Sequence, residues 1–97
     1  MEFTFEANLW KYQGKAAWYF VTLPLDVAVD IKEVYGKSER GFGSIKVSAR
    51  IGKTQWESSI FPDKSSGSYL LPIKKSVRES ENLIIDSTHK YGFKIAI

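Results

Sequence analysis

The sequence contains no cysteine and only one histidine, and these absences exclude several kinds of chemistry. Without cysteine the chain forms neither a disulfide framework nor a thiolate metal site, a composition that fits a reducing compartment. A single imidazole, His89, excludes sites that need several histidine ligands. We therefore expect no metal ion and no cofactor.

Long hydrophobic runs are also missing. The longest apolar stretch, residues 16–25, is interrupted by Thr22 and Pro24 and is far shorter than the roughly 20 residues that span a bilayer. The chain does not open with a basic segment followed by an apolar one, as a signal peptide does. We therefore expect a soluble, monomeric protein of the cytoplasm that has no membrane partner.

The chain has no strong excess of positive or negative charge, since 14 Lys and Arg against 11 Asp and Glu give a net charge of +3. The balance differs along the chain. Residues 1–36 contain three cations and five acids, a net charge of −2, whereas residues 37–97 contain eleven and six, a net charge of +5. The positive excess is therefore confined to the C-terminal part, which directs the search for a binding surface to that region.

What the chain does contain is alternation of apolar and polar side chains, which is typical of half-buried strands. With 97 residues, 43% of them hydrophobic, we expect one domain, residues 1–97, around one core. The strands are expected over residues 2–9, 16–23, 44–51, 54–61, 69–71 and 91–97, with a polar loop at 62–67. The second of them has Trp18 and Phe20 on one side and Tyr19 and Val21 on the other, so we expect both its faces to be covered.

Two helices are expected between these strands. The first begins after Pro24, which suits a first helical turn, and Gly36 is placed to end it. Its apolar stripe consists of Val27, Ile31, Val34 and Tyr35. A second, shorter helix begins at Pro72 and carries Ile73 and Val77 inward.

Two segments of the chain echo each other. GKAAW at 14–18 and GKTQW at 52–56 are each followed by a proline six residues after the tryptophan. Two related units of hairpin and helix would close a small barrel by interlocking hairpins, which removes exposed sheet edges. We therefore expect a mainly β fold: a small barrel in the order ββαββ(β)αβ, with two short capping helices and an internal twofold repeat.

Four segments carry a resemblance to a known family. They are RGFGSIKV at 40–47, IGKT at 51–54 with Trp56, SSIFP at 58–62 and GSYLLPIKKSVR at 67–78. In combination the chain resembles, over essentially its whole length, the bacterial family called domain of unknown function 1905. One departure is Ile85-Asp86, where members often carry Gly-Asp, so the turn before the last strand is expected to differ.

The resemblance implies a double-split β-barrel capped by helices, an architecture shared with some DNA-binding regulators and antitoxins. It implies no established activity, and a barrel by itself supplies none.

The most unusual charge placement lies at the start of the second expected helix. Lys74 and Lys75 stand in its first turn, with Arg78 one turn later, although cations there oppose the helix dipole. Free backbone N–H groups at such an end also bind anions. We therefore weigh a phosphate or carboxylate site formed by these residues against solvated lysines with Arg78 paired to Glu81 or to a strand carboxylate.

Further candidate ligand contacts lie elsewhere in the chain. Arg40 precedes Gly41-Phe42-Gly43 and is either a loop cation near an anionic ligand or part of a purely structural loop. Trp56, Ser58 and Tyr69 are placed to line a cleft near the second helix, although all three tryptophans are expected first of all in the core. A tryptophan that lines a ligand pocket is the alternative.

Nucleic acid is a second class of partner. RGFG begins like an RNA-binding strand signature, but Ser44 and Val47 stand where that signature needs aromatic side chains. Lys46 and Arg50 form ion pairs with the acids of residues 2–6 if the two strands are neighbours. These features favour a solvated polar face over a nucleic-acid stripe.

Catalytic motifs are absent from the sequence. No serine lies in a G-x-S-x-G turn, and we find no nucleophile and base for a hydrolase or transferase. We therefore expect a non-enzymatic binding or interaction module, whose partner is a small anionic ligand or another protein. Nucleic-acid binding through the basic C-terminal half and a purely structural accessory domain are the alternatives.

Overall fold

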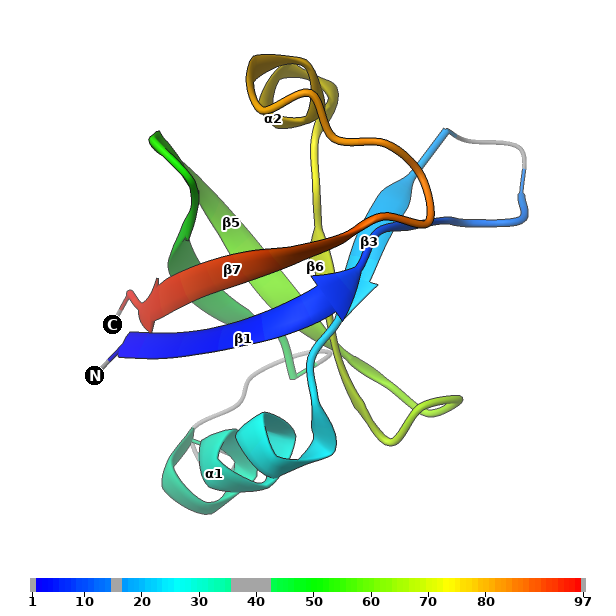
Figure 1. The fold of residues 1–97 in the computed structure, drawn as a ribbon. Coiled ribbons are helices and arrows are strands. Elements are labelled where there is room, and N and C mark those ends of the chain that lie inside the picture. Colours follow the sequence, from blue (N-terminus) through cyan, green and yellow to red (C-terminus); the bar gives the residue numbers. More distant parts are fainter. Residues whose placement is uncertain (1, 15–16, 36–42, 97) are drawn as a thin grey trace.

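The structure, a computed structural model, describes residues 2–14, 17–35 and 43–96 of the chain. These residues form seven strands and two helices (Figure 1). In chain order they are β1 (Glu2–Asn8), β2 (Trp10–Lys11), β3 (Tyr19–Thr22), α1 (Leu25–Tyr35), β4 (Ile45–Ile51), β5 (Thr54–Asp63), β6 (Ser68–Pro72), α2 (Lys75–Ser80) and β7 (Thr88–Ile95).

All seven strands belong to one antiparallel sheet in the order β1-β7-β4-β5-β6-β3-β2. The two ends of this order, β1 and β2, are consecutive in the chain and are separated only by Leu9, so the sheet curls round on itself. Leu9 is held there by its N–H, which donates to Ser87 O at 3.0 Å, and by its carbonyl, which accepts from Asp86 N at 2.7 Å. The predicted mainly β fold is confirmed, as a curled half-barrel with a short helix near each end (Figure 1).

The core fills the inside of the curled sheet. Its apolar side chains come from alternate positions of the strands, as the sequence pattern predicts. Phe3 stacks on Phe93 with ring centroids 5.2 Å apart, and Phe5 stacks on Tyr91 at 5.9 Å. These cross-strand ring pairs fix the register of β1 against β7.

The first helix lies where the sequence predicts it, and three residues of its predicted apolar stripe, Val27, Ile31 and Tyr35, pack against the core. Ala28 and Ile31 are its buried residues, whereas Val34 is exposed. The face that packs on the sheet is centred between Ala28 and Ile31, so Val34 lies beyond its edge. The expected helix end at Gly36 lies outside the described residues.

Two prolines stand in strands rather than at the predicted loop and helix start. Pro62 lies within β5 opposite Tyr69, and Pro72 ends β6 opposite Phe20. The helix α2 begins only at Lys75, because Ile73 N–H still continues the sheet by donating to Tyr19 O at 2.9 Å.

The two echoed hairpins place their tryptophans in opposite surroundings. Trp56 of β5 is 6% exposed and belongs to the core, whereas Trp18, just before β3, is 52% exposed. The prediction that both faces of the strand around Phe20 are covered is therefore wrong. Only the face that carries Val21 packs into the core.

Candidate functional site

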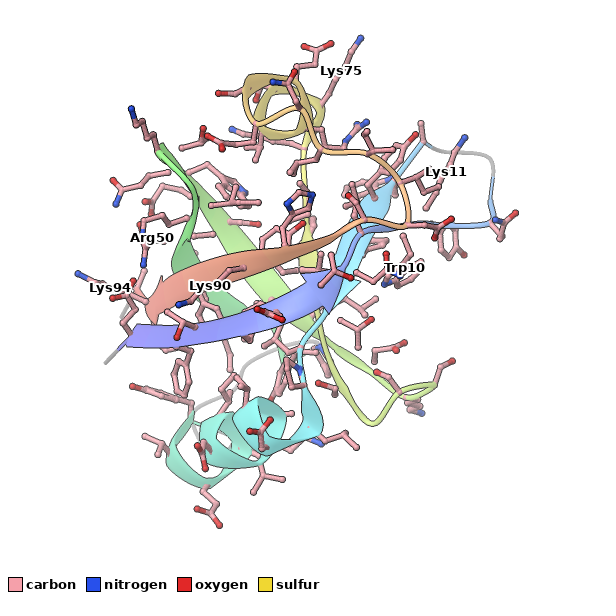
Figure 2. All side chains as sticks on the ribbon, in the orientation of Figure 1. Trp10, Lys11, Arg50, Lys75, Lys90 and Lys94 are labelled. Carbon is pink, nitrogen blue, oxygen red and sulfur yellow. The ribbon has the colours of Figure 1, made fainter. Side chains whose placement is uncertain are left out.

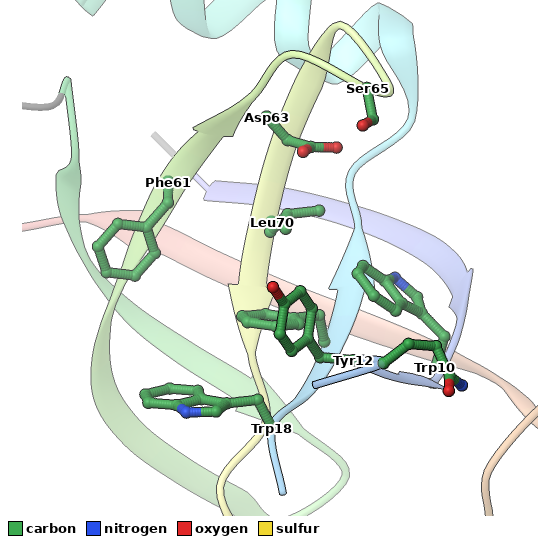
Figure 3. Close-up of a pocket in the computed structure, with 9 residues that line it drawn as sticks. Trp10, Tyr12, Trp18, Phe61, Asp63, Ser65 and Leu70 are labelled. Atoms are coloured by element: carbon green, nitrogen blue, oxygen red, sulfur yellow. The ribbon is translucent and has the colours of Figure 1, made fainter. Parts of the chain in front are cut away.

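An apolar groove of about 710 Å³ crosses the outer face of strands β2, β3, β6 and β5. Figure 3 shows Phe61 and Trp10 on opposite sides of it, with Asp63 and Ser65 at one end and Trp18 at the other. We call it the aromatic groove. Its lining consists of Trp10, Tyr12, Gln13, Trp18, Phe20, Phe61, Asp63, Ser65 and Leu70.

The strand alternation itself places these rings outward. Leu9, Val21, Ile60 and Leu71 point into the core, so the residues next to them in the chain point to the other face of the sheet. The register then places outward residues side by side. Trp10 lies opposite Phe20, and Phe61 lies opposite Leu70.

Contacts among the rings form the floor of the aromatic groove. Trp18 stacks on Phe20 with an interplanar angle of 8° and centroids 5.9 Å apart, and Trp10 meets the same ring at 5.3 Å. Trp10 is fixed further, since its Nε1–H donates to Thr22 Oγ1 at 3.0 Å. Tyr12 N–H donates to Trp18 O at 2.8 Å, which holds the two neighbouring rings at the end of the hairpin. Contacts within the chain itself thus hold the rings of the floor in place.

The rings remain accessible to solvent despite these contacts. Tyr12 is 50% exposed, Trp18 is 52% exposed and Phe61 is 41% exposed. Single exposed apolar side chains are ordinary on a soluble protein, whereas these exposed rings line one common groove.

The other half of the same sheet has an ordinary polar surface. Outward positions there carry opposite charges in register, such as Glu2 opposite Lys94 and Glu6 opposite Lys90. Arg50 Nη2 lies 2.6 Å from Glu2 Oε2 and reaches across Gly92, because β7 separates β1 from β4. The pairing predicted for neighbouring strands therefore forms across an intervening strand, and the aromatic surface is confined to one half of the sheet.

One end of the aromatic groove carries a carboxylate. Asp63 Oδ2 accepts hydrogen bonds from Ser66 N at 3.1 Å and from Ser66 Oγ at 2.8 Å. These bonds hold Asp63 at the start of the β5–β6 turn, which Gly67 completes with a φ of +72°. The acid is therefore fixed in place rather than free to swing away.

The opposite end adjoins a second, smaller groove of about 340 Å³, and Trp18 lines both. This cationic groove is lined by Ala17, Trp18, Tyr19, Pro72, Ile73, Lys74, Lys75 and Arg78. The Arg78 guanidinium lies 3.7 Å from the centroid of the Tyr19 ring, and its Nε donates to Ile73 O at 3.1 Å. Arg78 is therefore anchored by a ring and a carbonyl, and the predicted pairing with Glu81 is not what holds it.

The structure brings together three of the predicted site residues, Lys74, Lys75 and Arg78. The three residues form the wall of a groove and not an anion site at a helix N-terminus. The helix α2 has only six residues, so its aligned peptide dipoles are few. Arg40 lies outside the described residues.

The other predicted contacts do not line either groove. Trp56 and Tyr69 are buried in the core, since the alternation of β5 and β6 turns them inward. Ser58 shares the inward face of β5 and is half-buried, and its Oγ donates weakly to Ser59 O at 3.5 Å. These three residues line neither groove, and their contact with a ligand stays a prediction.

Sequence reasoning missed the aromatic groove, although a signal was present. The strand around Phe20 is apolar on both faces, a pattern that is equally typical of a strand covered on both sides and of a strand with one exposed apolar face. Two short helices are too few to cover both sides of a sheet of seven strands. The ratio of helices to strands therefore favours one exposed face, and the second apolar face of this strand is the candidate for it.

Other kinds of site find no support in the part of the chain that the structure describes. No group of three or more His, Asp or Glu side chains there is placed to hold a metal ion. His89 shares a hydrogen bond of 2.9 Å with Ser87 Oγ next to β7. None of the described helices has the length and apolar character needed to cross a membrane.

Comparison with known proteins identifies a family for this chain. The model of a family described as Domain of unknown function (DUF1905) matches residues 5–90. A search of curated proteins found no match. The match covers most of the chain, including every residue that lines the two grooves.

Proposed function

The chain belongs to the family described as Domain of unknown function (DUF1905), and from this premise we propose that it is a non-enzymatic binding module whose ligand occupies the aromatic groove. The family description names no activity, so the proposal is supported by the site. The observation that carries it is a preformed floor of aromatic rings on one half of a sheet whose other half is polar.

The rings favour a ligand with a flat apolar part. Apolar surface removed from water contributes about 25 cal/mol per Å², and offset ring stacking adds about 0.5–1.5 kcal/mol per pair. Because Trp10 and Trp18 are already held against Phe20, a ligand need not order them first.

The cationic groove favours a ligand that also carries an anionic group. Lys74 and Lys75 are exposed there, while Arg78 is held on the Tyr19 ring. Since Trp18 lines both grooves, a molecule with a flat body and a phosphate or carboxylate contacts rings and cations together. The proposal includes a cytoplasmic location, which the lack of cysteine supports.

A thermal-shift screen tests the proposal with phosphorylated and carboxylated metabolites, each with and without an aromatic ring. We expect compounds that combine a ring with an anionic group to raise the Tm most. Trp18→Ala should abolish that rise. Leu25→Ala, an exposed apolar change on α1, is the matched control and should preserve it. Equal responses of the wild type and Trp18→Ala to every compound contradict the proposal.

The alternative of nucleic-acid binding through the whole basic C-terminal half has less support. Figure 2 shows Lys75 on α2 well apart from Arg50 and Lys94. Arg50 is paired with Glu2, and Lys90 and Lys94 stand opposite acids of β1. A duplex footprint needs cations clustered along one face, and these are dispersed.

A further inference from the structure

We propose that the ligand of the aromatic groove is a short single strand of nucleic acid, with its bases on the rings and its phosphates along the cationic groove. This inference rests on the proposed function and specifies the ligand class. Proteins that bind single strands combine aromatic side chains, on which bases stack, with a positively charged groove that follows the backbone.

The floor offers open ring faces of the required kind. Trp18 and Phe20 are nearly parallel, and Trp10 is tilted by 40° against the same Phe20 ring. Every base has a flat π-face, so such a floor accepts bases with little regard to sequence.

The extent of the floor favours several nucleotides over one. Its rings and Leu70 come from four neighbouring strands, β2, β3, β6 and β5. Strands lie about 4.8 Å apart, so the floor extends over roughly 14 Å. That length exceeds the step between stacked bases, about 3.4 Å, several times.

The charges lie where a backbone would run. Lys74, Lys75 and Arg78 line the cationic groove beyond Trp18. No acid is among the described residues that line the cationic groove. Three cations at one end of an apolar floor complement a strand whose phosphates stay at that end while its bases reach inward over the rings.

Asp63 lies at the opposite end of the floor, away from the expected phosphates (Figure 3). A carboxylate repels a phosphate, but it accepts hydrogen bonds from exocyclic amino groups such as cytosine N4. Thymine has no such amino group. The position of Asp63 therefore favours cytosine over thymine at the base that reaches it.

The experiment is a binding titration followed by tryptophan fluorescence, with a cytosine strand of about ten nucleotides. We expect Trp18→Ala to weaken binding roughly tenfold, since one stacked base contributes about that factor. Lys74→Ala/Lys75→Ala should reduce the slope of log affinity against log salt by about 1.4, or 0.7 for each lost phosphate contact. Lys90→Ala/Lys94→Ala, two exposed lysines on β7, is the matched control and should retain the affinity of the wild type.

Four further ligands separate this inference from its rivals: an abasic strand of equal length, a cytosine mononucleotide, a duplex and a proline-rich peptide. The inference predicts that all four bind more weakly than the cytosine strand. It is overturned if the abasic strand or the duplex binds equally well, because stacking is then not used. It is also overturned if the mononucleotide or the peptide binds as tightly as the strand. If the mononucleotide or the peptide binds as tightly as the strand and Trp18→Ala weakens that binding, the proposed function still holds. If Trp18→Ala leaves the affinity for every ligand unchanged, both the inference and the proposed function are contradicted.

Discussion

At the scale of single residues, Trp18 and Trp56 show how one side chain type serves two purposes in a small barrel. Trp56 points inward from β5 and belongs to the core. Trp18 is stacked on Phe20 and faces the solvent. The burial of each ring, rather than its chemistry, decides whether it supports the fold or is available to a ligand.

Alanine at the two positions should separate stability from binding. We expect Trp56→Ala to lower the free energy of unfolding by about 3–5 kcal/mol, as for large core side chains. Trp18→Ala should lower it by about 1 kcal/mol or less, because the ring is half exposed. Urea unfolding measures both, with Trp56→Phe as a milder core variant if Trp56→Ala fails to fold. Equal losses at the two positions would contradict the assignment of Trp18 to a binding surface.

Tyr91 provides a second prediction at this scale. Its hydroxyl is buried and has no hydrogen-bond partner among the described residues, and burial raises the pKa of Tyr91 to about 12 from an ordinary value of 10.0. The folded state therefore holds this proton more tightly than the unfolded state. Above pH 10 the unfolded state binds fewer protons, so the free energy of unfolding should fall as the pH rises towards 12.

The variant Tyr91→Phe removes both the titrating group and the unpartnered hydroxyl. We expect it to be at least as stable as the wild type at neutral pH, since a buried hydroxyl without a partner costs free energy. The decline in stability above pH 10 should be smaller than in the wild type. Denaturant titrations over that range measure it, and an unchanged decline in Tyr91→Phe would show that other groups cause it.

At the scale of the elements, the β5–β6 turn positions one end of the aromatic groove. Asp63 is held by Ser66, and Lys32 of α1 donates from Nζ to Gly67 O at 3.1 Å. Gly67 has a φ of +72°, and a Cβ at this position would meet no atom within 4 Å. Any cost of a side chain at residue 67 is therefore conformational rather than steric.

Gly67→Ala and Gly67→Asn should differ in stability. Alanine in the left-handed region costs about 1–2 kcal/mol, whereas asparagine tolerates this region better. We therefore expect Gly67→Ala to reduce the free energy of unfolding and Gly67→Asn to reduce it less, as measured by urea unfolding. A loss in Gly67→Asn that matches or exceeds the loss in Gly67→Ala would mean that contacts, and not φ, govern the turn.

The elements also show what a sequence can and cannot predict. Alternation correctly predicts β4, because the positions of Val47, Ala49 and Ile51 already encode one buried face. It does not reveal that Pro72 continues β6, since that depends on pairing with Phe20, a residue far away in the chain. It also shows that the strand around Phe20 has two apolar faces without showing what covers each. Only the arrangement of the whole sheet decides that.

At the scale of the whole molecule, the curled sheet divides its outer surface into two halves. β1, β7 and β4 present paired charges, such as Glu2 with Arg50. β2, β3, β6 and β5 present the aromatic groove, with the cationic groove at its edge. The helices lie near the two ends of the sheet and leave the aromatic half uncovered (Figure 1). Within the positive excess of residues 37–97, Lys74 and Lys75 are the lysines that border aromatic rings of the cationic groove.

The central claim, that the aromatic groove is the binding surface, is tested most directly by the three indole N–H signals in a nitrogen–proton correlation spectrum. Trp10 and Trp18 line the aromatic groove, and Trp56 in the core serves as an internal control in the same molecule. On titration with a short cytosine strand, we predict that the signals of Trp10 and Trp18 shift progressively while that of Trp56 stays in place. A strand that binds without moving Trp10 or Trp18, or that moves all three signals equally, would contradict the account.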